Sequence, residues 1–266
     1  MNETVLLKLG GSLITDKNRR QIARRDTIAR LAAEIASALK ARPALQLVVG
    51  HGAGSFGHIE AREYGTRAGV HSPAAWRRFA EVAAVAARLN GIMLEALRAA
   101  DVPAMAFQPS ASVIAEDAVV STMAAEPLRR ALQSGLVPIV HGDVAFDDVR
   151  GGTIISTEDI FRYLATELKP SRILLAGIEP GVISGYPDGN VISEITTTGI
   201  DSIADQIQGS HAPDVTGGME SKVREMLAQI GRQPELEVQI FSGEEAGLVF
   251  AALTGQAQPG TRLRAA

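Results

Sequence analysis

The sequence feature that most limits how this chain can fold is a glycine-rich loop directly after a buried strand. Residues 45–49 are mostly apolar and predict the strand, and residues 50–58 hold four glycines together with His51 and His58. Glycine lets backbone N–H groups approach a phosphate closely, and an imidazole with an ordinary pKa of about 6.5 can add positive charge. The loop therefore predicts a phosphate site. The alternative is a tight turn whose histidines make only local hydrogen bonds.

The order strand, glycine loop, helix, strand predicts an α/β fold with a parallel sheet. Residues 5–9 predict a buried strand that runs into Gly10, Gly11 and Ser12, and residues 24–41 predict an amphipathic helix before the strand at 45–49. Further strands are expected at 102–107, 136–140, 172–176, 237–241 and 261–263, and further helices at 74–100, 123–134, from 156 onward and at 220–230. Residues 144–153 predict a hairpin or flap with the Gly151–Gly152 pair as its turn, and residues 177–190 predict irregular structure.

Length and composition limit the class of protein. The chain has 266 residues, which suit one compact unit with two lobes better than two independent domains. A net charge of −4 gives no general attraction for nucleic acid or an anionic membrane, so an anion must be bound by a local cluster. The sequence has no cysteine, no leader-like N-terminus and no apolar stretch of about 20 residues. We therefore expect a cytoplasmic protein.

Lysine is rare in this chain and lies in informative places. Of 26 basic residues only five are lysines, which leaves 26 − 5 = 21 arginines. Lys8, Lys17 and Lys222 lie in or beside glycine-rich segments, whereas Lys40 and Lys169 suit an exposed surface. An ammonium is a compact charge that can follow a moving phosphoryl group, whereas a guanidinium suits static bidentate binding. The distribution indicates phosphate chemistry, with chance as the alternative.

Three further segments are candidates for a site. His141, Gly142 and Asp143 follow a predicted strand, and polar residues at strand ends of an open α/β sheet face a shared crevice, unless they form an ordinary turn. At the predicted helix start near residue 156, Glu158 suits a capping role and Asp159 suits a turn toward the lysines. The pair at residues 217–218 before a helix bearing Lys222 predicts a second phosphate site or a plain turn. The apolar stripe of residues 74–100 predicts core, a dimer face or a pocket for an apolar substrate.

The motifs together resemble a known family. Residues 8–15 with Lys17, the loop at 50–58 and residues 214–222 are similar, in this order and over nearly the whole chain, to the amino acid kinase superfamily and within it to the isopentenyl phosphate kinases. The first motif is common in the superfamily, whereas the loop that ends in His58 is typical of the isopentenyl phosphate branch. The resemblance implies an open αβα sandwich with a mainly parallel central sheet, usually a homodimer. It places the acceptor in an N-terminal lobe of about residues 1–170 and ATP in a C-terminal lobe of about 171–266.

The resemblance also implies residue roles. Lys8 and Lys17 would stabilise the phosphoryl group that passes from ATP to isopentenyl phosphate, and Asp159 would orient the lysines. The residues implied to contact ATP are Lys8, Gly10, Gly11, Ser12, Gly54, Gly218 and Lys222. The residues implied to bind the acceptor are Ala53, Gly54, His58 and Thr157. Mg²⁺ is expected from the chemistry of ATP, although the sequence names no dedicated set of metal ligands.

The chain departs from the family pattern in two places. Residues 156–159 read Ser-Thr-Glu-Asp where the family usually has Ser-Gly-Asp-Asp, and residues 178–181 read Ile-Glu-Pro-Gly where relatives carry a turn of the Asp-Val-Asp-Gly type. The first change makes the backbone approach to substrate at Thr157 less open, and the second bears on nucleotide preference and affinity. Two alternatives stay open: a kinase of the same fold that acts on UMP or a carboxylate, and a nucleotide-binding protein without catalysis.

Overall fold

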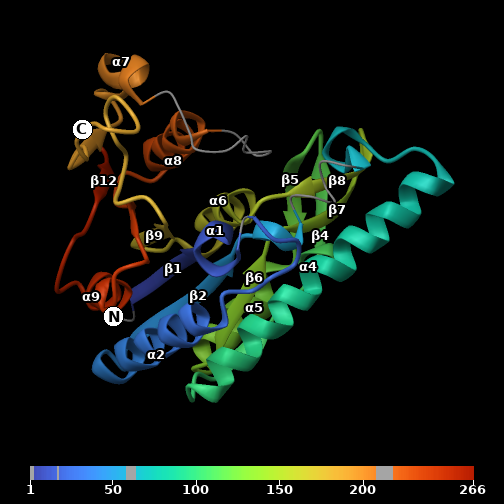
Figure 1. Cartoon of the computed structure of the whole chain (residues 1–266), viewed down its shortest axis with the longest axis horizontal. Helices are drawn as coiled ribbons and strands as arrows, with labels where there is room; N and C mark the ends of the chain where they lie inside the picture. The colour runs from blue at the N-terminus through green and yellow to red at the C-terminus, as the bar shows by residue number, and fades with distance from the viewer. Residues whose placement is uncertain (1–2, 17, 58–63, 208–217) are drawn as a thin grey trace.

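The apolar runs that the sequence predicts as strands form one central sheet. A computed structural model describes residues 3–16, 18–57, 64–207 and 218–266 (Figure 1). The sheet has eight strands in the order β10-β12-β11-β9-β1-β2-β6-β3, and β12 pairs antiparallel with β11 while the other pairs are parallel. The bounds are β1 Glu3–Leu9, β2 Leu45–His51, β3 Ala104–Ala106, β6 Val137–His141, β9 Arg172–Gly177, β10 Glu194–Thr196, β11 Glu237–Ser242 and β12 Thr261–Arg264. The predicted mainly parallel α/β sheet is therefore confirmed.

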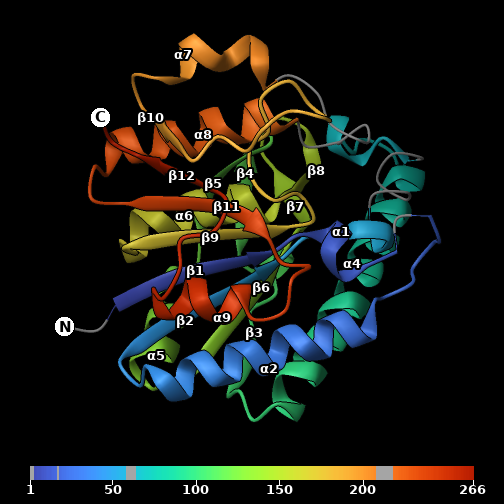
Figure 2. The same cartoon turned by 60° about the vertical axis from the view of Figure 1, so that its left-hand side comes forward.

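Helices cover both faces of this sheet, which makes three layers. One face carries α2 (Arg25–Ala41), α4 (Pro73–Ala99) and α9 (Leu248–Thr254), and the other carries α5 (Ala125–Gln133), α6 (Thr157–Leu168) and α8 (Met219–Arg232). Figure 2 shows β1, β9 and β11 between α6 and α8 on one side and α2 and α9 on the other. The predicted single or double helix at 74–100 is one continuous helix, and its apolar stripe is mostly core.

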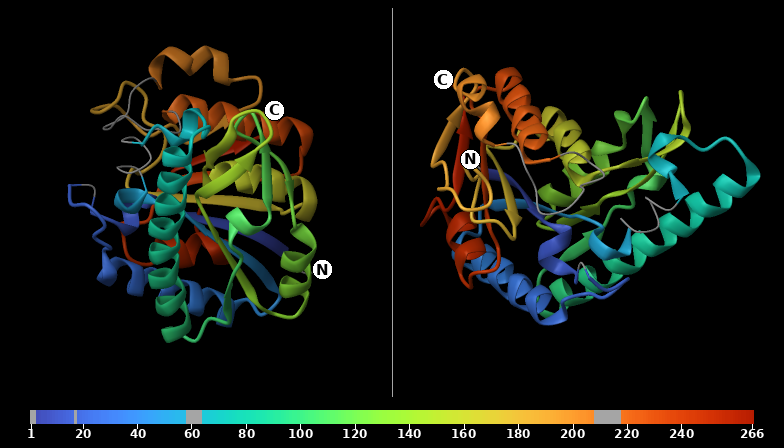
Figure 3. Two further views of the ribbon diagram at one scale, coloured as in Figure 1. Left: turned by 90° about the vertical axis from the view of Figure 1, so that its right-hand side faces the viewer. Right: turned by 45° about the horizontal axis from the view of Figure 1, so that its top comes forward.

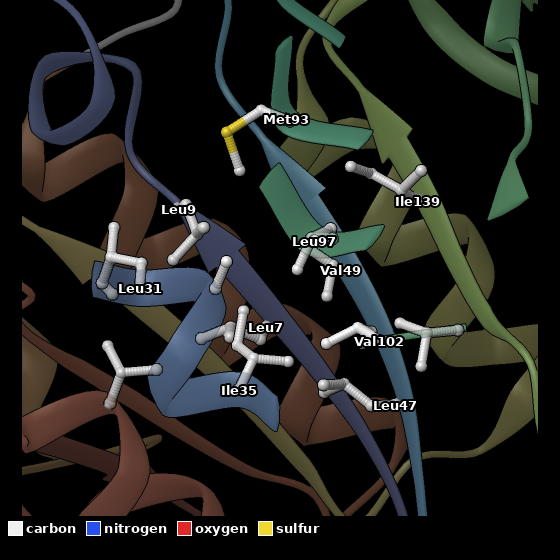
Figure 4. Packing of buried hydrophobic residues seen from close by; sticks show 14 of the residues in the cluster. Leu7, Leu9, Leu31, Ile35, Leu47, Val49, Met93, Leu97, Val102 and Ile139 are labelled. Carbon is white, nitrogen blue, oxygen red and sulfur yellow. The ribbon is translucent and has the colours of Figure 1, made fainter. Parts of the chain in front are cut away.

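Alternation along the strands divides the core between the two faces. Val5, Leu7 and Leu9 of β1 join one cluster of buried side chains, whereas Leu6, between Val5 and Leu7 in the sequence, joins the other. Figure 4 shows Leu7 and Leu9 facing the helices, together with Leu31 and Ile35 of α2. Burial on both faces explains why these strands are continuous apolar runs in the sequence.

A second, smaller sheet lies beside the N-terminal part of α4. It has the order β5-β4-β7-β8, with β4 Val113–Glu116, β5 Val119–Met123, β7 Asp143–Asp147 and β8 Gly151–Ile155. Figure 3 shows α4 running along one side of the molecule, past these hairpins. The predicted hairpin at 144–153 is confirmed, but its turn is at residues 148–150 and the two glycines begin β8.

The remaining described elements are short. They are α1 (Gly11–Ile14), η1 (Gly54–Phe56), η2 (Thr66–Ala68), η3 (Pro109–Ala111), α7 (Ile200–Ile203) and η4 (Ala204–Gln206). Among the helices of the described ranges, none combines the length and the apolar character needed to cross a bilayer.

Candidate active site

The candidate site lies where four central parallel strands end. Leu9 of β1 pairs in register with His51 of β2 and with Ala176 of β9, and His51 pairs with His141 of β6. The segments that follow these strands therefore begin side by side at one edge of the sheet. This is the edge at which open α/β sheets bind ligands.

The two predicted phosphate loops are in contact at this edge. A Cβ atom at Gly52 would lie 2.8 Å from the backbone nitrogen of Gly11, and one at Gly11 would overlap the backbone of Gly54. Gly54 itself has a φ of +49°, in the left-handed region that favours glycine. Side chains at these positions would force the loops apart, so the glycines are needed for the two backbones to meet.

The neighbouring loop residues are fixed by short backbone bonds. The N–H of Gly10 donates to the carbonyl of Ala176 at 2.8 Å, which ties the first loop to β9. Ser12 lies in α1 and is half-buried, as is Ala53 at the start of η1. Gly218 is the N-cap of α8 and is exposed, as expected for a glycine before that helix.

Two of the predicted lysines meet on one carboxylate. Lys8 of β1 forms an ion pair and hydrogen bond with Glu158, at the second position of α6. The Nζ atom of Lys222, in the first turn of α8, lies 3.7 Å from the same oxygen of Glu158. Segments that are far apart in the sequence thus converge, and they bring two ammonium groups to the loop edge of the sheet.

The charges around Glu158 keep it ionised. Burial raises the pKa of this carboxyl. The ammonium groups of Lys8 and Lys222 and the hydrogen bond from Lys8 lower it by more, so the resulting pKa is about 2. The side chain of Glu158 is 8% exposed, and those of Lys8 and Lys222 are 13% and 25% exposed. The site is therefore a partly enclosed cluster with two positive charges and one negative charge.

The expected contacts of Glu158 and Asp159 are exchanged in the structure: Glu158 meets Lys8 and Lys222, and Asp159 caps α6. Asp159 forms a capping box with Ser156: its Oδ2 accepts hydrogen bonds from the Ser156 N–H at 2.8 Å and hydroxyl at 2.7 Å. Its Oδ1 accepts a hydrogen bond from Arg162 at 2.5 Å. Successive helix residues point about 100° apart, so only one of the two acids can face the lysines. That residue is Glu158, whereas Asp159 caps the helix.

Thr157 joins α6 to the strand that carries the second loop. Its hydroxyl donates to the backbone carbonyl of His51 at 2.6 Å, and the residue is only 1% exposed. A Cβ atom at Gly50 would meet the methyl group of Thr157, which shows how tightly α6 and β2 pack here. The Thr157 hydroxyl is therefore bonded within the protein, beside the predicted acceptor loop.

The imidazole of His51 points into the protein, not toward the loop surface. It is 1% exposed and stacks on His141, with ring centroids 5.4 Å apart. Burial and the adjacent His141 lower the pKa of His51 to about 3, and burial lowers the pKa of His141. Burial also raises the pKa of Asp143, which accepts hydrogen bonds from Gln108 and the Ser110 N–H.

The expectation that the polar cluster at residues 141–143 faces an open crevice is therefore wrong, because the cluster is buried beneath the edge of the sheet. Sequence inspection missed two of its members, Asn90 and Gln108, which bond to the rings of His51 and His141. A polar residue within the apolar stripe of α4 is the one signal that points to Asn90. Two predicted site residues, Lys17 and His58, and residues 214–217 lie outside the described residues.

Comparisons with known proteins agree with this geometry. The sequence model of the Amino acid kinase family matches residues 3–242. Isopentenyl phosphate kinase of Methanocaldococcus jannaschii is 34% identical over 95% of this chain and 96% of its own length, and that of Methanothermobacter thermautotrophicus is 33% identical over 97% and 98%. A solved isopentenyl phosphate kinase superposes with a TM-score of 0.81 at 30% identity, over 97% of this chain and 99% of its own.

A more distant structure shares the fold alone. The carbamate kinase of Giardia lamblia bound to AMP-PNP superposes with a TM-score of 0.71 at 16% identity, over 100% of this chain and 99% of its own. The two curated relatives match over 96% and 98% of their own length. The chain therefore belongs to the amino acid kinase family, and within it to the isopentenyl phosphate kinases.

Proposed function

We propose that the protein transfers the γ-phosphoryl group of ATP to isopentenyl phosphate, giving isopentenyl diphosphate. The observation that carries the proposal is the convergence of Lys8 and Lys222 on Glu158, beside two glycine loops in backbone contact. Two phosphorylated molecules that meet end to end need such a concentration of ammonium and N–H groups. The names of the full-length relatives supply the acceptor.

The acceptor is held by the second glycine loop in this proposal. Ala53 and Gly54 present backbone N–H groups, and His58 donates to the acceptor phosphate. Thr157 acts indirectly, because its hydroxyl is bonded to the carbonyl of His51 at the base of this loop. An acceptor phosphate is already ionised, so the reaction needs positioning and charge neutralisation and no strong general base.

The nucleotide is held by the first loop and by the start of α8. Gly10, Gly11 and Ser12 contact its phosphates, together with Gly54, and Gly218 and Lys222 provide the helix N-terminus and its charge. Lys8 and Lys17 stabilise the phosphoryl group in transfer. Glu158 takes the orienting role first given to Asp159, because it holds both Lys8 and Lys222.

Mg²⁺ suits this site as a metal held mainly by ATP and water. Within the described ranges no three His, Asp or Glu side chains are grouped to hold a metal ion. Glu158 is paired with two lysines, and Asp159 is engaged by Ser156 and Arg162. Mg²⁺ typically binds substrate phosphates with one or two carboxylates at most, and it would neutralise charge on the β- and γ-phosphates.

The hydrocarbon tail of the acceptor is expected along the N-terminal half of α4. This helix packs against both η1 of the acceptor loop and β7 of the small sheet. Trp76 and Phe79 of α4 cluster there with Phe146 of β7, whose side chain is half exposed. A partly exposed aromatic cluster on the helix that also packs against the acceptor loop suits a short branched hydrocarbon. We further propose a cytoplasmic homodimer with an acceptor lobe of about residues 1–170 and a nucleotide lobe of about 171–266.

The proposal is tested by measuring ADP release with ATP and isopentenyl phosphate, and by identifying the product by phosphorus NMR. UMP, carbamate and N-acetylglutamate serve as competing acceptors at equal concentration. Lys8→Met should abolish most of kcat, whereas Lys40→Met, an exposed lysine at the end of α2, should not. His58→Ala should raise the acceptor KM and leave ATP binding unchanged. Turnover of another acceptor in preference, or ATP binding without any turnover, would reject the proposed reaction.

A further inference from the structure

A buried polar cluster behind the acceptor loop has no role in the reaction as proposed. It consists of the stacked rings of His51 and His141, which we call the imidazole pair, and of the side-chain amides of Asn90 and Gln108. His51, His141 and Asn90 are each 5% exposed or less. Buried polar groups are costly unless they are hydrogen-bonded, so a complete network at this place requires a reason.

The ring of His51 bonds at both nitrogens. Nδ1 lies 3.1 Å from the carbonyl oxygen of Gly52, and Nε2 lies 3.1 Å from Oδ1 of Asn90, an amide whose oxygen and nitrogen exchange places on a half-turn. A carbonyl only accepts, so Nδ1 carries the proton and donates to Gly52. A neutral ring then accepts at Nε2, and rotation of the Asn90 amide presents its NH₂ group there. Asn90 thereby selects the tautomer that holds the Gly52 carbonyl.

The surroundings of the pair keep both rings neutral. The groups that face His51 are His141 on β6, Asp143 on β7 and the uncharged Asn90 on α4. Burial and His141 lower the pKa of His51 more than the bond to the Gly52 carbonyl and the charge of Asp143 raise it. In His141, Nδ1 lies 2.9 Å from the Gly142 carbonyl oxygen and Nε2 lies 3.3 Å from Oε1 of Gln108, whose NH₂ group donates to Asp143. Two stacked rings at 5.4 Å can pack in this way because neither is charged.

The backbone of His51 connects the pair to both halves of the site. Its carbonyl accepts from the N–H of Gly142 at 3.2 Å and from the hydroxyl of Thr157 at 2.6 Å. Thr157 is followed by Glu158, which holds the two lysines. On the other side, the carbonyl that Nδ1 holds belongs to Gly52, whose backbone touches Gly11. A rotated ring at position 51 would therefore disturb the acceptor loop and the start of α6 together.

We propose that His51, held in one tautomer by Asn90, is a positioning residue that fixes the acceptor loop against the first turn of α6. The ring never touches substrate and acts through the Gly52 carbonyl and the His51 backbone. The inference rests on the proposed function for its kinetic readout. It predicts that a change at Asn90, on α4, weakens acceptor binding although every residue of the acceptor loop is unchanged.

Two variants of Asn90 and one control test this inference. Asn90→Leu removes the donor to Nε2. Asn90→Asp places a carboxylate at Nε2, which favours the doubly protonated ring of His51, and that ring still donates from Nδ1 to Gly52. When the ring loses one proton at higher pH, the other proton stays on Nε2 to face the carboxylate, and the bond to Gly52 is lost. Leu97→Ala, a change of a fully buried core residue two helical turns after Asn90, controls for general destabilisation. The readouts are the KM for isopentenyl phosphate from pH 6 to 9 and hydrogen exchange of residues 50–57 and 157–160 without substrate.

We expect Asn90→Leu to raise the acceptor KM about tenfold, with ATP KM unchanged, and to speed exchange in both segments. Relative to the original protein, Asn90→Asp should have a near-normal KM at pH 6 that rises toward the Asn90→Leu value by pH 9. Such a titration would not come from a merely structural role. Leu97→Ala should change neither readout.

Normal KM and normal exchange in Asn90→Leu would overturn the inference, as would an Asn90→Asp profile parallel to that of the original protein. Equal effects from Leu97→Ala would also overturn it. The exchange measurement uses no substrate, so it decides the inference even if isopentenyl phosphate is not turned over. Failure of the proposed function would instead be seen as an original protein without activity.

Discussion

Replacing Glu158 by glutamine should lower the free energy of unfolding by more than the loss of an exposed ion pair does. The carboxyl has an ordinary pKa of 4.5, which burial raises and the two lysines lower to about 2. At about 1.36 kcal/mol per pKa unit, the difference corresponds to about 3 kcal/mol. Because the folded pKa is depressed, this contribution is complete above pH 4.5 and is lost as pH falls toward 2. At pH 7 the variant should therefore lose about 3 kcal/mol in the free energy of unfolding.

The burial of the cluster justifies so large a value. The side chain of Glu158 is 8% exposed, so water screens the interaction weakly. The glutamine amide is nearly the same size but leaves Lys8 and Lys222 with no counter-charge from position 158. Each ammonium then repels the other in a partly enclosed space.

The measurement is urea unfolding at pH 7, followed by circular dichroism. Glu126→Gln is a matched control, because Glu126 also lies in the first turn of a helix and pairs with two basic residues, but on the surface. Exposed pairs contribute little, so this control should change the free energy of unfolding by less than about 1 kcal/mol.

ATP supplies a second arm of the test. Its phosphates replace the missing negative charge, so saturating ATP should raise the melting temperature of Glu158→Gln more than that of the original protein. A loss below about 1 kcal/mol, or equal shifts with ATP, would refute the role of Glu158 as the counter-charge of both lysines.

Three further perturbations follow from the structure. His51 has a pKa of about 3 in the folded chain, so between pH 6.5 and 5 only the unfolded chain binds a proton there. The free energy of unfolding should therefore fall by about 2 kcal/mol over this range. In denaturant titrations, His51→Gln should reduce this dependence on pH. Asp147 accepts four backbone N–H groups from two turns, so Asp147→Ala should lower the free energy of unfolding by about 2 kcal/mol, whereas the exposed neighbour Asp148→Ala should not. Gly54→Ala should reduce kcat/KM about a hundredfold, since its Cβ would overlap the first loop; Gly135→Ala, with a similar positive φ but open space around it, should keep full kcat/KM.

The sequence predicted best those elements whose pattern reflects burial. The strands β1, β2 and β9 are buried on both faces, so they are apolar runs that need no knowledge of their partners. Strands β4 and β5 were missed because they are short and one face is largely exposed. The helix α9 was missed for a different reason: its seven residues are too few to establish a period.

The site was predictable in composition but not in detail. The glycines indicated where the backbone must approach another group closely, and the rare lysines indicated where a compact positive charge is needed. The sequence does not decide between Glu158 and Asp159, because either acid suits the first turn of a helix. The choice depends on how α6 docks against β1 and α8, and that is a property of the folded chain.

The N-terminal strand β1 lies in the middle of the central sheet, between β2 and a strand that starts at Arg172. Closing a chain segment of that length carries an entropic cost before any pairing is gained. Strand β1 must therefore wait for the segment that begins at Arg172 before both its edges are paired. A fragment that ends before β9 would leave one edge of β1 unpaired, so the centre of the sheet is complete only when both parts of the chain are present.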